Sequence, residues 1–304
     1  MRTFSCPYVL GCCATAFGLI GCATNSSMAP TSALSAASQV PSIAHVLQYM
    51  PTRTSAPADV SGIQVPYLGG PVVVNPKTYL ILWGYKKYGD PDGVAKLMQE
   101  YLKVEGGSGH NNIYTQYYEV VSGQKIYITN PKGQSGGIWD DEKDGVAPYP
   151  TDAQVAAEAL AGVAHFGYDA NGSYIVATPH GHSSQGFGTQ WCAYHSTTYY
   201  GGQLVSYTNL PYIPDARANC GANSIAPTKD ESRKDEGVTI VEGTEYGESI
   251  TDPNPGSGWY SSEYGEIGNL CSGLHNDRFG NKSYTMKAMY SNATSGGSCV
   301  QTYK

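Results

Sequence analysis

Residues Gly237 to Pro255 read GVTIVEGTEYGESITDPNP and carry the strongest structural signal in the chain. The spacing predicts a helix from about Glu236 to Ile250. Two valines and three acids then share one stripe of that helix: Val238, Val241, Glu245, Glu248 and Asp252. Buried carboxylates are unfavourable unless they are paired or bound to a metal. The stripe therefore indicates a helix that packs beneath a functional site.

Strands and helices alternate before this helix. Apolar runs predict strands at 79–83, 125–129 and 173–177. One helix is predicted after Asp90, with Pro91 at its first position and an end at Gly106. A second follows the possible capping box of Thr151 and Gln154. This order predicts an α/β fold: a single domain with a central sheet, packed helices that include the buried helix of about 236–250, and a loop-rich, disulfide-stabilised C-terminal half.

The cysteines fall into two groups of four. The first group is N-terminal: Cys6, Cys12, Cys13 and Cys22. The second lies in the domain: Cys192, Cys220, Cys271 and Cys299. Four cysteines in an exported protein indicate two disulfides, and we expect Cys192 to pair with Cys220 and Cys271 with Cys299. A zinc site of four thiolates is the alternative, without a C-x-x-C spacing in its favour.

The N-terminus has the pattern of an export signal. Residues 1–21 hold one charge, Arg2, and an apolar run too short for a membrane span. The run ends in LIGC, which is typical of a bacterial lipobox and predicts lipidation of Cys22; an ordinary signal peptide is the alternative. Residues 22–60 predict a flexible tether rich in Ser, Thr, Ala and Pro, and 61–304 the domain. We expect an outer-membrane or cell-surface lipoprotein, otherwise a secreted protein.

Composition limits the partners. The net charge is −7 and no basic cluster occurs, so nucleic acid is not an expected partner. The 25 tyrosines and 37 glycines, with few charges, fit an extracellular protein in contact with a peptide or cell-wall substrate. Membrane contact is expected through the lipid anchor only. The oligomeric state is not indicated.

Three segments around the central helix carry a family resemblance. They are residues 239–253, Gly258-Trp259-Tyr260 and Gly265-Glu266-Ile267-Gly268. They resemble a group of exported bacterial proteins in which the helix reads H-E-Y-A-E and is followed by T-D-P. The chain is more distantly similar to the plant EXORDIUM, or phosphate-induced, proteins. This resemblance implies a metallopeptidase-like domain.

The resemblance also implies roles for individual residues. In a zinc peptidase of this pattern, positions 244 and 248 bind the metal and position 245 is the general base. Carried over, Glu245 is the base, Glu248 is a ligand, and Glu266 is the third ligand, with Asp252 as the second choice. Thr244 departs from the pattern, because a neutral hydroxyl is a weak substitute for imidazole.

This departure leaves three interpretations open. A histidine from elsewhere completes a zinc site, and the candidates are His180 and His182, which could equally be surface-loop residues. Alternatively, the acids bind a harder ion such as calcium. In the third interpretation the site is vestigial. The chain is then a catalytically degenerate EXORDIUM-like cell-envelope or carbohydrate-binding protein, instead of a zinc-dependent peptidase.

An aromatic cluster is the remaining candidate. Trp191, Tyr194 and His195 are expected either to line a substrate groove or to pack in the core, as aromatic clusters more often do.

Overall fold

The computed structural model describes residues 48–52, 60–143 and 145–304, all within one compact unit. The predicted signal peptide, the lipidation site Cys22 and most of the predicted tether lie outside the described residues. Twelve strands are described: β1 (Gln48–Pro51), β2 (Lys77–Trp83), β3 (Tyr118–Val121), β4 (Gln124–Tyr127), β5 (Ser135–Asp141), β6 (Gly172–Ala177), β7 (Trp191–Tyr200), β8 (Gln203–Leu210), β9 (Leu274–Phe279), β10 (Lys282–Lys287), β11 (Met289–Ser291) and β12 (Ser298–Val300).

The described helices are fewer. They are α1 (Tyr85–Tyr88), α2 (Val94–Leu102), α3 (Asp152–Phe166) and α4 (Glu236–Thr251), with the 3₁₀ segments η1 (Asn111–Gln116) and η2 (Ile213–Cys220).

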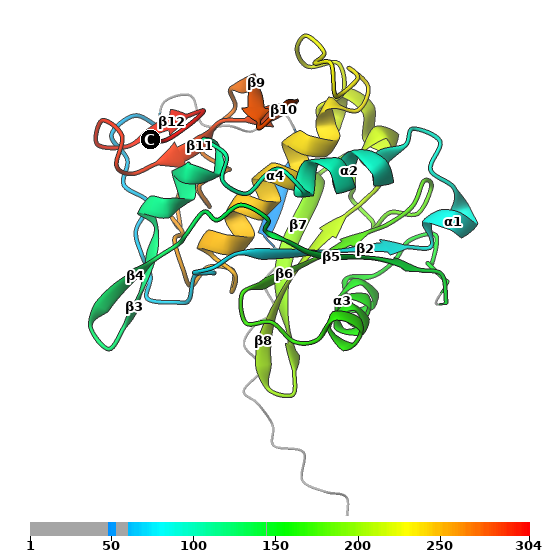
Figure 1. Cartoon of the computed structure of the whole chain (residues 1–304), viewed down its shortest axis with the longest axis horizontal. Helices are drawn as coiled ribbons and strands as arrows, with labels where there is room; N and C mark the ends of the chain where they lie inside the picture. The colour runs from blue at the N-terminus through cyan, green and yellow to red at the C-terminus, as the bar shows by residue number, and fades with distance from the viewer. Residues whose placement is uncertain (1–47, 53–59, 144) are drawn as a thin grey trace, which may run out of the picture. The chain divides into compact units, whose positions relative to one another are not determined.

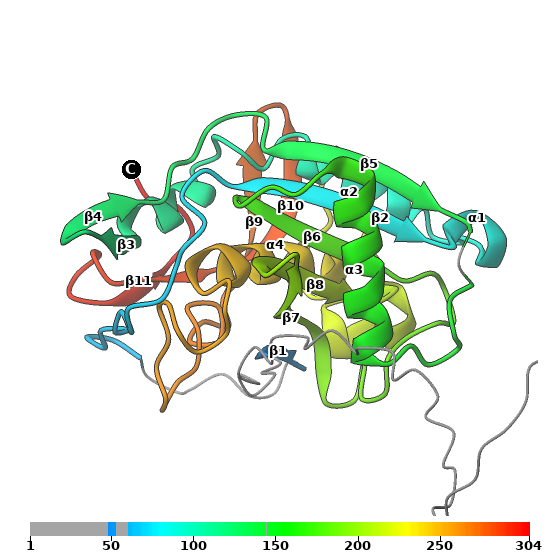
Figure 2. The same cartoon turned by 90° about the horizontal axis from the view of Figure 1, so that it is seen from below.

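A mixed sheet organises the fold, in the order β1-β7-β8-β6-β2-β5. Strands β8, β6, β2 and β5 run parallel to one another. Strand β7 pairs antiparallel with β8, and the edge strand β1 pairs antiparallel with β7. Helix α3 covers one face, and α2 and α4 cover the other (Figures 1 and 2). This matches the predicted α/β class with a central sheet and packed helices.

Alternation along the strands builds the two layers of the core. In β2, Leu80 and Leu82 pack in one cluster with Val238 of α4, whereas Ile81 packs in another with Val163 of α3. Successive side chains of a strand point to opposite faces. A continuous apolar run such as 79–83 therefore serves both helical layers at once.

Helix α4 is enclosed on all sides. All of its 16 residues are buried, between the sheet, α2, η2 and the β9–β10 hairpin. Two of its glycines permit this packing: a Cβ on Gly247 would lie 2.6 Å from the ring of Tyr114, and one on Gly243 would overlap the Met286 methyl group. At these two positions the close neighbours are side chains rather than a second backbone.

The C-terminal half contains the predicted disulfides. Cys192 pairs with Cys220 and Cys271 with Cys299, which confirms the expected connectivity. Disulfides persist in oxidising compartments, so they indicate an extracytoplasmic environment. Within the described ranges, no helix has the length and apolarity needed to cross a membrane.

Some local predictions need adjustment. The predicted strand at 125–129 is present as β4, but it pairs with β3 in a separate hairpin, and β5 takes the place beside β2. Asp90 accepts hydrogen bonds from Val94 and Ala95 as a cap would, but α2 begins at Val94 because Pro91 lies in the preceding turn. The capping box of Thr151 and Gln154 at the start of α3 is confirmed.

We expect Gly247→Ala to lower the free energy of unfolding by about 1–3 kcal/mol, although alanine is the better helix former, because its methyl group would overlap Tyr114. Urea unfolding measures the change. The matched control is Gly273→Ala, whose added Cβ would meet only Ala288 at 3.8 Å and should shift stability by less than about 0.5 kcal/mol. Equal effects of the two variants would contradict the packing argument.

Candidate metal centre

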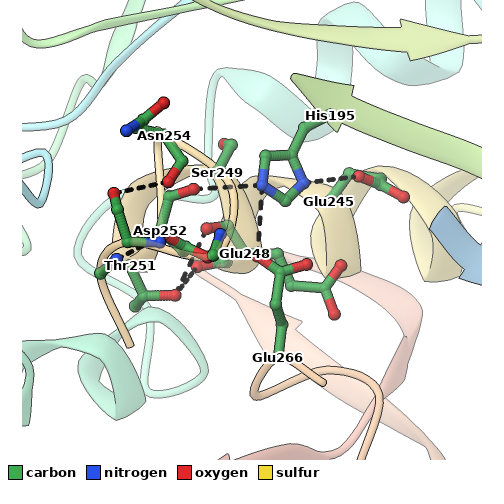
Figure 3. Close-up of polar contacts among 12 residues, drawn as sticks. His195, Glu245, Glu248, Ser249, Thr251, Asp252, Asn254 and Glu266 are labelled. Carbon is green, nitrogen blue, oxygen red and sulfur yellow. Dashed lines mark hydrogen bonds and ion pairs between the residues drawn. The ribbon is translucent and has the colours of Figure 1, made fainter. Parts of the chain in front are cut away.

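One histidine and three glutamates meet between the sheet and α4 (Figure 3). His195 comes from β7, the strand next to the edge of the sheet. Glu245 and Glu248 lie nearly one turn apart on α4 and so share the face that packs on β7. Glu266 comes from the segment after α4. The side chains of all four are no more than 1% exposed.

The imidazole of His195 is held from both sides. Its Nδ1 lies 3.3 Å from Oε2 of Glu245. Its Nε2 lies 3.2 Å from Oε1 of Glu266 and 3.2 Å from the backbone carbonyl of Asp252. One ligand atom each from His195, Glu245 and Glu248 falls within 4.8 Å of the others. The geometry is that of a ligand cluster around a common point.

Several carboxylate oxygens of the cluster have no hydrogen bond among the described residues. They are both oxygens of Glu248, both of Glu266 and Oε1 of Glu245, although Glu266 still faces the His195 ring. Buried polar groups in native proteins are almost always hydrogen-bonded or bound to an ion. These orphan oxygens are the observation that makes the donor set fit a metal ion.

The electrostatics of the cluster depend on burial. Burial raises the pKa of Glu248 well above its usual value, and the nearby Glu266 and Glu245 raise it further. Burial also raises the pKa of Glu266, to about 7, against the opposing effect of His195. Burial disfavours a charged imidazole, yet Glu266 and Glu245 outweigh it and raise the pKa of His195 well above the ordinary value. His195 and Lys287 of β10 are the basic groups that face these acids, and burial lowers the pKa of Lys287.

A cleft opens beside the cluster. It is lined by Met50, Thr52, the Cys192–Cys220 disulfide, Cys271, Leu274 and Lys287. Lys287 connects the two, because it interacts electrostatically with both Glu248 and Glu245. The cleft is therefore the approach that the structure offers to the buried acids.

The structure brings Glu245, Glu248 and Glu266 together, but it places the other predicted ligands elsewhere. The carboxylate of Asp252 accepts backbone hydrogen bonds from Gly256, Ser257 and Gly258, so it closes the loop after α4. His180 is exposed, with Nδ1 2.6 Å from Asp215, and His182 packs on Tyr88. Neither histidine belongs to a ligand cluster among the described residues.

Position 244 has no room for the missing imidazole. The Thr244 hydroxyl donates to the carbonyl of Ile240, one turn back in the helix. Its methyl group faces Gly268, where a Cβ would lie 2.6 Å from it and 2.5 Å from Oε1 of Glu248. Packing at this point fits a small residue, and the imidazole of the cluster comes from β7 instead.

Sequence reasoning did not select His195 as a ligand candidate. It had assigned His195 to an aromatic cluster that is core or groove, and Trp191 and Tyr194 do pack in the core with α3. His195 follows Tyr194 directly and therefore points to the opposite face, toward α4. Alternation between Tyr194 and His195 was the available signal, but it required recognising β7 as a strand, and a register shift at the start of β7 places Trp191 on the same side as Tyr194.

Comparisons with known proteins give no relative: no family model, curated protein or solved structure matches the chain.

We expect Glu248→Gln to reduce the bound zinc by about one equivalent per chain, since it removes a central carboxylate ligand. In excess chelator the same variant should be at least as stable as the wild type, because it no longer buries an ionisable group without a hydrogen bond. Elemental analysis and thermal unfolding measure the two effects. The control is Glu263→Gln, an exposed position in the loop that carries Glu266. A variant that retains its zinc would contradict the assignment.

Proposed function

We propose that the protein is an exported, metal-dependent peptide hydrolase whose centre is built on His195, Glu245, Glu248 and Glu266. The orphan carboxylate oxygens around a buried imidazole carry this proposal. An imidazole among the donors favours zinc over calcium, which prefers oxygen ligands alone. Export is supported by the two disulfides, and the lipid anchor at Cys22 belongs to the same proposal.

The residues divide into holding and reacting groups. His195 and Glu248 hold the ion, and Glu266 together with the Asp252 carbonyl orients the imidazole, as outer partners of metal-bound histidines do. Glu245 is the general base, three residues before the ligand Glu248 and on the same face of α4. When bound, the ion supplies Lewis-acid polarisation of a carbonyl and activation of water.

Strand β1 supports a peptide substrate. It runs antiparallel to β7, with Gln48 opposite His195 and Met50 opposite Ala193. The backbone N–H of Met50 donates a hydrogen bond to the carboxylate of Glu245. An extended backbone therefore already lies against the proposed base. Pairing with a strand edge recognises main-chain groups, which only a polypeptide offers in this repeat.

A second candidate, a binding protein without catalysis, is favoured by the enclosure of the cluster. Every one of the four side chains is buried, and β1 covers the edge of the sheet beside them. In that case the cluster stabilises the fold, and the cleft beside Lys287 binds a cell-envelope ligand.

We expect the purified full chain, loaded with zinc, to cleave denatured casein, and Glu245→Gln to reduce kcat by at least about 100-fold, because general-base catalysis contributes roughly that much. Product peptides are quantified by mass spectrometry. Glu263→Gln should keep wild-type activity, and the zinc content of Glu245→Gln is measured in parallel. Activity that survives both Glu245→Gln and chelator would refute the hydrolase, and zinc binding with no turnover would favour the binding protein.

Displacing β1 is expected to raise activity. Met50→Pro removes the N–H that donates to Glu245 and weakens the pairing with β7, so the edge becomes available to substrate. We expect kcat/KM for casein to rise several-fold, mainly through a lower KM. Thermal unfolding checks that the domain stays folded. An unchanged or lower kcat/KM in a folded variant would show that β1 does not occupy the substrate position.

A further inference from the structure

A second cluster of ligand-type side chains lies at the C-terminal side of the domain. His110 precedes η1, and His275 and Asp277 lie on β9. The two β9 residues are separated by one position, so they project from the same face of the hairpin. The cluster shares no residue with the first centre and plays no part in the proposed hydrolysis.

The three side chains converge on one point. The carboxylate Oδ2 of Asp277 lies 3.9 Å from Nδ1 of His110 and 4.0 Å from Nε2 of His275. All three ligand atoms fall within 4.8 Å of one another. Zinc binds histidine nitrogen and carboxylate oxygen at about 2.0–2.2 Å. Two ligands of one zinc ion are thus separated by roughly 3–3.5 Å, and a closure of about half an ångström or more brings the three atoms to that spacing.

Four atoms of the cluster lack a well-aligned hydrogen bond within the described ranges. They are Nδ1 of His110, both ring nitrogens of His275 and Oδ2 of Asp277. His110 is fully buried and His275 is 9% exposed, so water does not readily supply partners. The remaining nitrogen of His110, Nε2, lies 3.2 Å from the hydroxyl of Tyr114. That contact orients the ring and leaves Nδ1 directed at Asp277, the usual arrangement around a metal-bound histidine.

We propose that His110, His275 and Asp277 form a second zinc site, independent of the first centre and of the proposed hydrolase activity. Two imidazoles and one carboxylate are a donor set that suits zinc better than calcium or magnesium. The backbone of Gln301 also approaches the His110 ring, so the ion links the β9–β10 hairpin, η1 and the C-terminal segment. The site is structural: it holds together three elements that are distant in sequence.

The test uses the full chain in a Glu248→Gln background, which removes the first centre. The protein is stripped with chelator, reloaded with zinc alone, and analysed for bound metal and thermal unfolding. We expect one equivalent of zinc per chain to remain in this background, and zinc to raise the Tm. Adding Asp277→Asn, which preserves shape, or His275→Ala should abolish both the bound equivalent and the shift. Adding His182→Ala, on the exposed loop, should change neither.

Cobalt gives an independent readout. Loaded in place of zinc in the Glu248→Gln background, it should give visible ligand-field absorption that disappears when Asp277→Asn is added. This readout remains if the His275→Ala variant does not fold. Zinc content in Glu248→Gln equal to that in Glu248→Gln/Asp277→Asn would overturn the second site. Because the measurements are zinc content, Tm and absorption, this site can fail while the hydrolase proposal stands, and the reverse.

Discussion

The burial of α4 is the constraint on which the rest of the structure depends. A helix with four glutamates has been placed in the interior: Glu236, Glu242, Glu245 and Glu248. Each buried carboxylate is unfavourable by several kcal/mol when it is charged and unpaired. The surroundings of α4 compensate for this cost in different ways along the length of the helix.

At the N-terminal end of α4, hydrogen bonds compensate for the burial of the carboxylate. Glu236 accepts backbone hydrogen bonds from Ser224 and Ile225, and its place in the first turn suits the helix dipole. In the middle the solution is neutrality, because burial and the nearby Glu105 raise the pKa of Glu242 well above its usual value. At the C-terminal end, His195 and Lys287 face Glu245 and Glu248. This end of α4 carries the cluster that we propose as the metal centre.

Many features of the fold and of the cluster can be predicted from the sequence, and those that cannot have identifiable physical reasons. The position of α4, the capping box at Thr151 and the two disulfides depend on local spacing and on cysteine number, which a sequence displays. Glu245 and Glu248 were selected because helical periodicity places them together. His195 was not, because its approach to α4 depends on β7 crossing the helix, a contact between residues 50 apart in the chain. Asp252 shared the stripe, but the chain leaves the helix there and its carboxylate turns to the loop backbone.

The structure gives Thr244 a different interpretation from the sequence. In the sequence it marks a lost ligand, which favours a vestigial site. In the structure it lies against Gly268, in the layer where the Glu266 segment crosses α4. A small residue there lets Glu266 come within reach of His195, whereas an imidazole at 244 would push that segment away. The histidine on β7 and the threonine on α4 are then two parts of one arrangement, in which the imidazole is supplied by the sheet and the helix supplies only acids. Retaining buried acids without hydrogen-bond partners is difficult to explain for a site that has lost its ion, since substitution by apolar residues would stabilise the fold.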